Sequence, residues 1–391
     1  MLEAHFTSFF IILLVAVFFS AVFARLHLPW AVALIVGGMV IGPHGFDFFK
    51  PNETILFLSE IGLIFLMFMA GLEVRFESFK KRASSISSIA FINGFLPFLA
   101  GLGIGLLLDL PLMTALLLGI IFISSSIAVV VPSLEANKLI GTKLGDAIVG
   151  STMLQDIASL VLLSVFFQTS EDLSSIPLPI FYLLLLGFLV FLRKILPRIE
   201  KLFAQGGVFQ QELRSVFLVL LGTVVVFELL DLHPIIAGFF AGLVLSDRVN
   251  AVKIKEKLRA ISYGLFIPIF FVVIGMQSNL GVFRSATGVL VAVLVITLGS
   301  IVSKVVSGWI GARLMSFTKK EAALVAVTSV PQLSTTLAVA FSSYALGLID
   351  EAFVTSLVIL SIVTTLLAPL VTNFLLKSFT PESVEEELKT V

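Results

Sequence analysis

Apolar runs about as long as a lipid bilayer is thick follow one another along nearly the whole chain, separated by short polar segments. About 20 apolar helical residues cross a hydrocarbon core of roughly 30 Å. The thirteen runs lie at 6–24, 30–46, 54–73, 85–108, 112–132, 143–168, 178–197, 212–230, 233–246, 262–279, 286–313, 320–345 and 352–376. The pattern predicts an all-α polytopic membrane protein with about 13 transmembrane helices.

The distribution of Lys and Arg supports both the number of helices and their direction. If the N-terminus lies outside, only Lys50 and Arg284 fall in outer segments and Lys304 falls within a helix, while every other Lys and Arg faces the cytoplasm. Basic residues are retained in cytoplasmic loops. We therefore expect a multi-pass protein of the inner (plasma) membrane, with its N-terminus outside and its C-terminus in the cytoplasm.

Two of the runs contain residues that interrupt a helix. Ser124, Ser125 and Ser126 stand in the middle of the fifth run, and Pro331 lies within a polar stretch, 328–336, in the twelfth. Hydroxyls and proline at mid-depth are typical of discontinuous membrane helices, whose freed backbone groups need side chains, water or an ion. We predict that both helices are broken.

These two helices are an odd number of spans apart, so they cross the membrane in opposite directions. This spacing predicts inverted repeats, the first at 1–168 (helices 1 to 6) and the second at 212–378 (helices 8 to 13). A linker helix 7 at 169–211 joins them, and a short cytoplasmic tail follows at 379–391.

Composition narrows the chemistry further. The chain is 58% hydrophobic and 13% charged, with a mean hydropathy of +1.14, far from the values of a soluble domain. Cysteine is absent, which excludes disulfides, thiolate metal sites and a thiol nucleophile. The formal net charge is zero and by itself indicates no partner.

Asp156 is the residue most indicative of function, because it lies near the middle of the apolar run 143–168. A charge at the bilayer centre costs about 2.5–3.5 kcal/mol on insertion scales, so such residues are rare. We interpret Asp156 as a carboxylate that binds a monovalent metal cation or a proton. The alternative is a structural carboxylate that joins two helices through hydrogen bonds.

Lys304 is deep in the run 286–313, too far from its end to reach the interface easily. We expect it to form an ion pair with Asp156, which an arriving cation would break; a purely structural salt bridge is the alternative. Neighbouring oxygens could complete a cation site, although small polar residues also serve helix packing. These candidates are Gln155, Ser125, Ser126 and Thr152.

Several motifs resemble those of the bacterial monovalent cation:proton antiporters of the Kef and Nap type, over essentially the whole membrane region. They are Ile41-Gly42-Pro43, Glu60-Ile61-Gly62, Gly71-Leu72-Glu73, Gln155-Asp156, the segment 233–239, the segment 267–276, and Lys304 with Gly308 and Gly311-Ala312. The resemblance implies the sodium/proton antiporter fold, with two crossed broken helices in a core domain and a separate dimerisation domain. It implies elevator-like alternating access in a homodimer, an ion at Asp156 and Lys304 as the competing internal cation.

The chain also departs from that family. Gln332 and Ser334 stand where the family often has an Arg and an acid, and the nucleotide-binding domain common in Kef-type proteins is missing from this chain. We expect no cofactor apart from the transported Na+ or K+ and H+, and no nucleic-acid partner. A transport-inactive ion or pH sensor on the same fold, or a cation channel, remains an alternative; no Gly-x-Ser-x-Gly or His-Glu-x-x-His motif suggests an enzyme.

Overall fold

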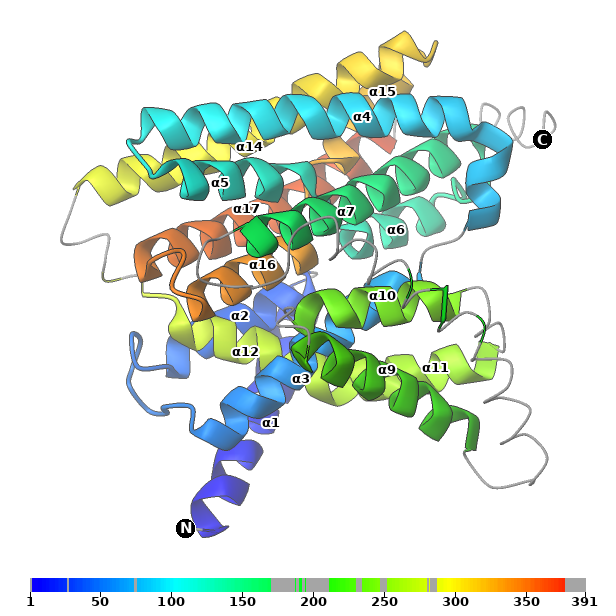
Figure 1. The fold of residues 1–391 in the computed structure, drawn as a ribbon. Coiled ribbons are helices and arrows are strands. Elements are labelled where there is room, and N and C mark those ends of the chain that lie inside the picture. The colour runs from blue at the N-terminus through cyan, green and yellow to red at the C-terminus, as the bar shows by residue number, and fades with distance from the viewer. Residues whose placement is uncertain are drawn as a thin grey trace. The chain divides into compact units, whose positions relative to one another are not determined.

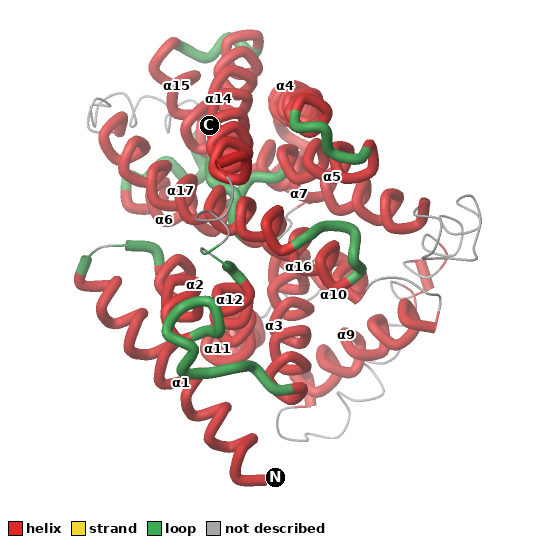
Figure 2. The backbone as a smooth tube through the Cα atoms, turned by 90° about the vertical axis from the view of Figure 1, so that its left-hand side faces the viewer, coloured by secondary structure: helices red, strands yellow, loops and turns green. Residues whose placement is uncertain are grey.

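The computed structural model describes residues 2–26, 28–73, 76–169, 187, 190, 191, 194, 211–229, 234–246, 252–279, 281 and 287–376. All regular structure in these ranges is helical (Figures 1 and 2). The helices are α1 (Leu2–Arg25), α2 (Trp30–Ile41), α3 (Glu53–Leu72), α4 (Phe76–Leu107), α5 (Leu112–Ile123), α6 (Ile127–Ala136), α7 (Lys143–Thr169), α9 (Gln211–Leu229), α10 (Pro234–Ser246), α11 (Val252–Ile261), η1 (Ser262–Phe266), α12 (Ile267–Gln277), α14 (Thr287–Leu314), α15 (Lys319–Thr328), α16 (Ser334–Ala345) and α17 (Glu351–Leu376).

Seven helical stretches in these ranges are long and apolar enough to cross a membrane singly. They lie at His5–Arg25, Glu53–Leu72, Ala83–Leu107, Lys143–Phe167, Ile254–Gln277, Val289–Leu314 and Glu351–Leu376. The predicted all-α polytopic class is confirmed. Apart from the single positions 187, 190, 191 and 194, the predicted run 178–197 lies outside the described residues. The predicted tail 379–391 lies outside them entirely.

Both predicted breaks are present. α5 ends at Ile123 and α6 begins at Ile127, while α15 ends at Thr328 and α16 begins at Ser334. The two breaks contact each other, because the Ser126 backbone N–H donates to the Pro331 carbonyl at 2.6 Å. The Ser124 and Thr336 hydroxyls lie 3.1 Å apart. The backbone groups that each break frees are thus partly satisfied by the other break.

The run predicted at 262–279 differs in its first part. It continues a helix that begins at Val252 and contains the π-turn η1. Pro268 explains the turn, because it has no N–H to donate to the Gly264 carbonyl and its ring crowds that oxygen. The backbone widens, and the Ile267 N–H bonds to the Ser262 carbonyl instead.

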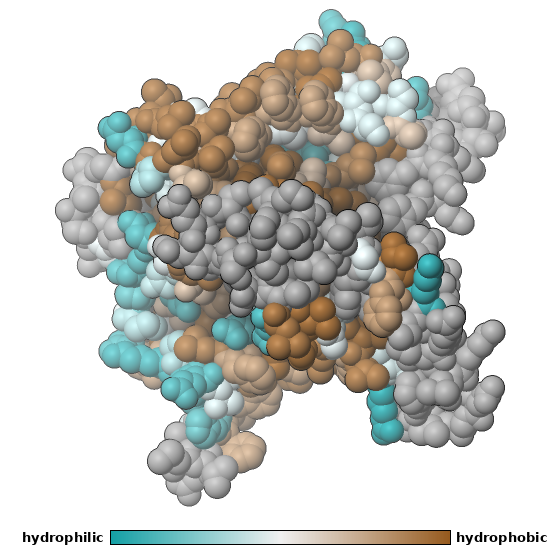
Figure 3. Space-filling model, viewed as in Figure 1, coloured by the Kyte–Doolittle hydropathy of each residue, from teal (hydrophilic) through white to brown (hydrophobic). Residues whose placement is uncertain are grey.

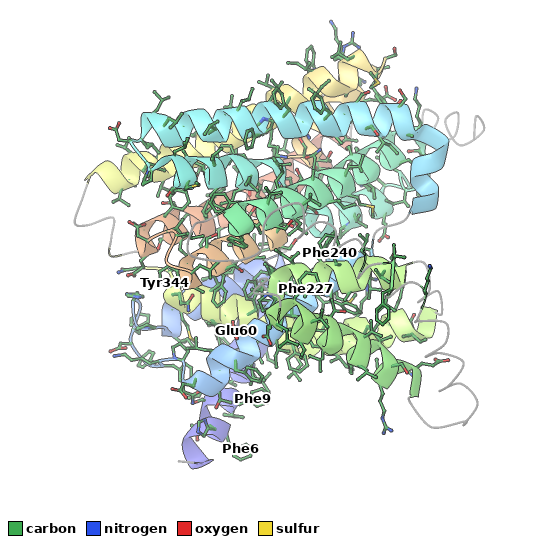
Figure 4. All side chains as sticks on the ribbon, in the orientation of Figure 1. Phe6, Phe9, Glu60, Phe227, Phe240 and Tyr344 are labelled. Atoms are coloured by element: carbon green, nitrogen blue, oxygen red, sulfur yellow. The ribbon has the colours of Figure 1, made fainter. Side chains whose placement is uncertain are left out.

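The chain divides into two compact units, the first comprising 1–9, 51–76 and 162–271. It contains α3, α9, α10 and α11, and Figure 4 labels Glu60, Phe227 and Phe240 on the first three of these helices. α3 and α10 meet backbone to backbone. A Cβ at Gly71 would overlap the Phe239 carbonyl oxygen, and one at Gly242 would overlap that of Phe68.

The second unit comprises 10–50, 77–161 and 272–391 and contains both broken helices. A reciprocal glycine contact joins α2 to α12: a Cβ at Gly38 would overlap the Val272 carbonyl oxygen, and one at Gly275 that of Ile35. The side chains that cover α4 and α14 are mainly hydrophobic in Figure 3. Exposed α14 residues such as Leu294, Leu298 and Val302 suit a lipid-facing surface.

Candidate functional site

The Lys304 side chain is fully buried in the second unit, at 0% exposure, in the middle of α14. Its ammonium donates to the Ile123 carbonyl at 2.5 Å, to Ser125 Oγ at 2.9 Å and to Gln155 Oε1 at 2.9 Å. The Asn93 carbonyl lies at 3.3 Å. α4, the end of α5, the first break and α7 each supply one oxygen, so this cluster fixes several helices around one charge.

The sequence predicted a direct ion pair between Lys304 and Asp156, and the structure shows a different arrangement. Within the described part of the chain, the hydrogen bonds of the ammonium go to four neutral oxygens. An ammonium has three hydrogens, so the four oxygens share them. Gln155, one residue before the acid on α7, occupies the position that we expected the carboxylate to take.

Gln155 is the contact between α7 and the ammonium, and its side chain is 1% exposed. Its Oε1 accepts from Lys304, and Ser125 Oγ lies 3.1 Å from the same atom. The cation fixes the orientation of the amide, because a flipped amide would present NH2 donors to an ammonium. Among the described residues, Nε2 of this amide has no hydrogen-bond partner.

Ser125 joins the first break to three other elements. Its hydroxyl accepts from Lys304, lies 3.1 Å from Gln155 Oε1 and lies 2.7 Å from the Ser329 carbonyl at the second break. A hydroxyl carries a single hydrogen, so it can donate to only one of those two oxygens at a time. Movement at either break therefore alters the cluster around the ammonium.

Asp156 follows Gln155 on α7 and is partly buried. Thr335 Oγ1, at the start of α16, donates to its Oδ1 at 3.4 Å. Of the other predicted ligands, Thr152 is buried and donates to the Ile148 carbonyl of its own helix at 2.9 Å, which leaves its oxygen able to accept. Ser126 is buried at the first break, and its hydroxyl has no protein partner among the described residues.

The structure brings Ser125, Gln155 and Lys304 into direct contact, with Asp156 next in sequence. Sequence reasoning did not single out Asn93, the Ile123 carbonyl or Thr335 as part of the site. An Asn within the apolar run 85–108 is a detectable signal, and Thr335 stood in the polar stretch around Pro331. A single free carbonyl leaves no such trace in the sequence.

Gln332 occupies the second break and is fully buried. Its backbone N–H donates to Thr364 Oγ1 at 3.2 Å, and its Nε2 lies 3.5 Å from the Phe122 carbonyl near the end of α5. A neutral amide thus bridges the two broken helices at the position where the resembled family often has an Arg.

Comparisons with known proteins identify the family of the chain. The family model described as "Sodium/hydrogen exchanger, transmembrane" matches residues 10–378. The chain is 32% identical to the probable Na(+)/H(+) antiporter 3 of Methanocaldococcus jannaschii, over 95% of this chain and 96% of that protein. It is 26% identical to the Na(+)/H(+)-K(+) antiporter GerN of Bacillus cereus, over 88% and 89% of the two chains.

Solved structures show the same fold. The sodium proton antiporter MjNhaP1 from Methanocaldococcus jannaschii at pH 8 superposes with a TM-score of 0.69, covering 96% of this chain and 99% of that one at 16% identity. The chain belongs to the sodium/hydrogen exchanger family and is a secondary transporter that exchanges a cation for protons.

Proposed function

We propose that Asp156 is the site that a monovalent cation and a proton share, and that Lys304 is an internal cation competing with the transported one. The observation that carries this proposal is the pair of hydrogen bonds from the Lys304 ammonium to Ser125 Oγ and Gln155 Oε1. Those two oxygens were predicted from the sequence as cation ligands. The Lys304 ammonium, a cation attached to the chain, therefore occupies part of the proposed set of ligands for the transported ion.

Exchange follows from competition for these oxygens. An arriving Na+ or K+ binds the Asp156 carboxylate and takes over Gln155 Oε1 and Ser125 Oγ, with the Ser126 and Thr152 hydroxyls as further ligands. The ammonium must leave for this to happen. A proton on Asp156 removes the negative charge that attracts the cation, so the metal ion leaves and Lys304 returns to the oxygens.

We infer that the second unit carries the site across the membrane in an elevator-like motion. All the residues of the site lie in that unit, so a rigid movement preserves their geometry. We propose that the first unit serves as the dimerisation domain of a homodimer. Each unit combines segments from both halves of the chain, which supports inverted repeats at 1–168 and 212–378.

The names of the relatives favour Na+ or K+ as the transported ion. The M. jannaschii relative is named for Na+, and the B. cereus relative for both Na+ and K+. We propose a plasma-membrane location with the N-terminus outside, on the strength of the Lys and Arg distribution.

Proton flux in liposomes tests the proposal. An imposed pH gradient is followed with an internal dye while Na+, K+ or Li+ is added to wild type and to Asp156→Asn. We expect at least one cation to evoke flux in wild type and the variant to lose it, because an amide supplies oxygen without charge. Glu60→Gln, the same change at an exposed acid on α3, is the matched control and should retain flux.

Two results would overturn the proposal. Equal flux in wild type and Asp156→Asn would remove Asp156 as the shared site. Wild-type protein that binds cations but gives no flux with any of them would identify a sensor on this fold.

A further inference from the structure

We propose that Pro97 on α4 is a positioning residue for cation exchange, because it frees the Asn93 carbonyl that receives the Lys304 ammonium. The inference rests on the proposed competition between Lys304 and the transported cation. It adds a residue that acts through the Asn93 carbonyl.

The argument begins with helix geometry. In an α-helix each N–H donates to the carbonyl four residues earlier, and proline has no N–H. Pro97 is buried inside α4, and the residue four positions before it is Asn93. The Asn93 carbonyl therefore lacks the helical donor that it would otherwise have. Lys304 Nζ lies 3.3 Å from this oxygen.

A second backbone carbonyl is freed in a parallel way. α5 ends at Ile123 because Ser124 adopts an extended conformation, with φ −67° and ψ 154°. The Ile123 carbonyl at this end accepts from Lys304 at 2.5 Å. Two of the four oxygens around the ammonium are thus main-chain atoms at helix interruptions. Such oxygens cannot rotate away or take up a proton, so they give the ammonium a fixed position to which it can return.

The Asn93 side chain fixes the position of the Asn93 carbonyl relative to α14. Its Oδ1 accepts from Ser307 Oγ at 2.7 Å, and Ser307 lies one turn after Lys304. Asn93 is 1% exposed and Ser307 is 0% exposed. The main chain and the side chain of one residue therefore both bind α14, and a proline placed elsewhere in α4 would free a different carbonyl.

Pro97→Ala supplies the missing N–H and tests the proposal. The new donor competes for the Asn93 carbonyl and weakens the hold on the ammonium, so the transported cation displaces Lys304 more easily. We expect the apparent KM for the cation, from liposome flux, to fall about three- to tenfold, which is less than loss of a whole hydrogen bond to a charge would give, because the carbonyl is shared rather than removed. The difference should disappear in a Lys304→Met background, which has no ammonium to hold, whereas a general packing defect would persist.

Two matched variants separate this role from a structural bend. Pro369→Ala makes the same change inside α17, where the carbonyl four residues earlier belongs to Thr365. That carbonyl is not among the oxygens around Lys304, so the KM of Pro369→Ala should equal that of wild type. Incorporation of the α-hydroxy analogue of alanine at position 97 replaces the backbone amide with an ester that has no N–H. This variant should restore the wild-type KM. If Pro97→Ala does not fold, Pro97→Gly provides the same N–H.

The proposal is wrong if the variant that carries an N–H keeps the wild-type KM, if the ester variant behaves like alanine, or if Pro97→Ala still lowers KM in a Lys304→Met background. Loss of flux in Asp156→Asn combined with an unchanged KM in Pro97→Ala would remove this inference and leave the proposed function in place.

Discussion

Lys304 is bound by oxygens that carry no formal charge, and this affects how readily it can leave them. A buried ion pair is costly to break, because each charge is left uncompensated at low dielectric. Hydrogen bonds from an ammonium to neutral oxygens contribute about 1.5–3 kcal/mol each. An incoming cation can replace those bonds one for one, because it is coordinated by the same kind of neutral oxygen.

Lys304→Met should expose this relationship through stability. Loss of the ammonium leaves buried oxygens unpaired at about 1–3 kcal/mol each, so we expect a lower Tm in detergent. Na+ or K+ should raise the Tm of the variant more than that of wild type, because the vacated oxygens are the proposed cation ligands. Lys319→Met, the same change at an exposed position, should show the wild-type response. An identical cation response in all three proteins would contradict the competition.

At the scale of elements, the contact between α14 and α15 positions the second break. A Cβ at Gly308 would lie 2.9 Å from Ala326 Cα and 2.9 Å from Ser329 Oγ. Ser329 in turn offers its carbonyl to Ser125 at 2.7 Å. A single glycine on α14 therefore controls how closely α15 and its break approach the ammonium.

Gly308→Ala should consequently lower both stability and transport. Overpacking costs about 1–3 kcal/mol, and here the strain falls on the α15 backbone at Ala326 as well as on the Ser329 hydroxyl. Thermal unfolding and liposome flux measure the two effects. Gly103→Ala on α4 is the control, because its Cβ meets nothing within 4 Å. Wild-type flux in Gly308→Ala would show that this contact does not position the break.

The elements divide into those that the sequence could predict and those that it could not. The breaks at 124–126 and 329–333 were predictable, because interrupted helices in a bilayer need polar side chains that stand out from an apolar background. The π-turn before Pro268 was not predicted, because hydropathy does not register how the helix is wound. Two of the four partners of Lys304 were not predicted because they are main-chain carbonyls, which every residue has.

At the scale of the whole molecule, the proposed topology places Lys50 outside and Lys319 inside. Both side chains are exposed, and the chain contains no cysteine, so a thiol introduced at either position is unique. We expect an impermeant maleimide to label Lys50→Cys in intact cells and Lys319→Cys only after permeabilisation. The reverse pattern would invert the orientation, and labelling of both in intact cells would contradict the number of spans between them.

The glycine contacts of α3 with α10, and of α2 with α12, have a mechanical consequence. Each is a reciprocal pair in which the backbone of one helix touches the backbone of the other, with no side chain between them. Side chains can absorb a displacement by changing rotamer, whereas two main chains in contact cannot. Each pair should therefore move as one rigid unit, so a displacement of one helix should be transmitted to its neighbour.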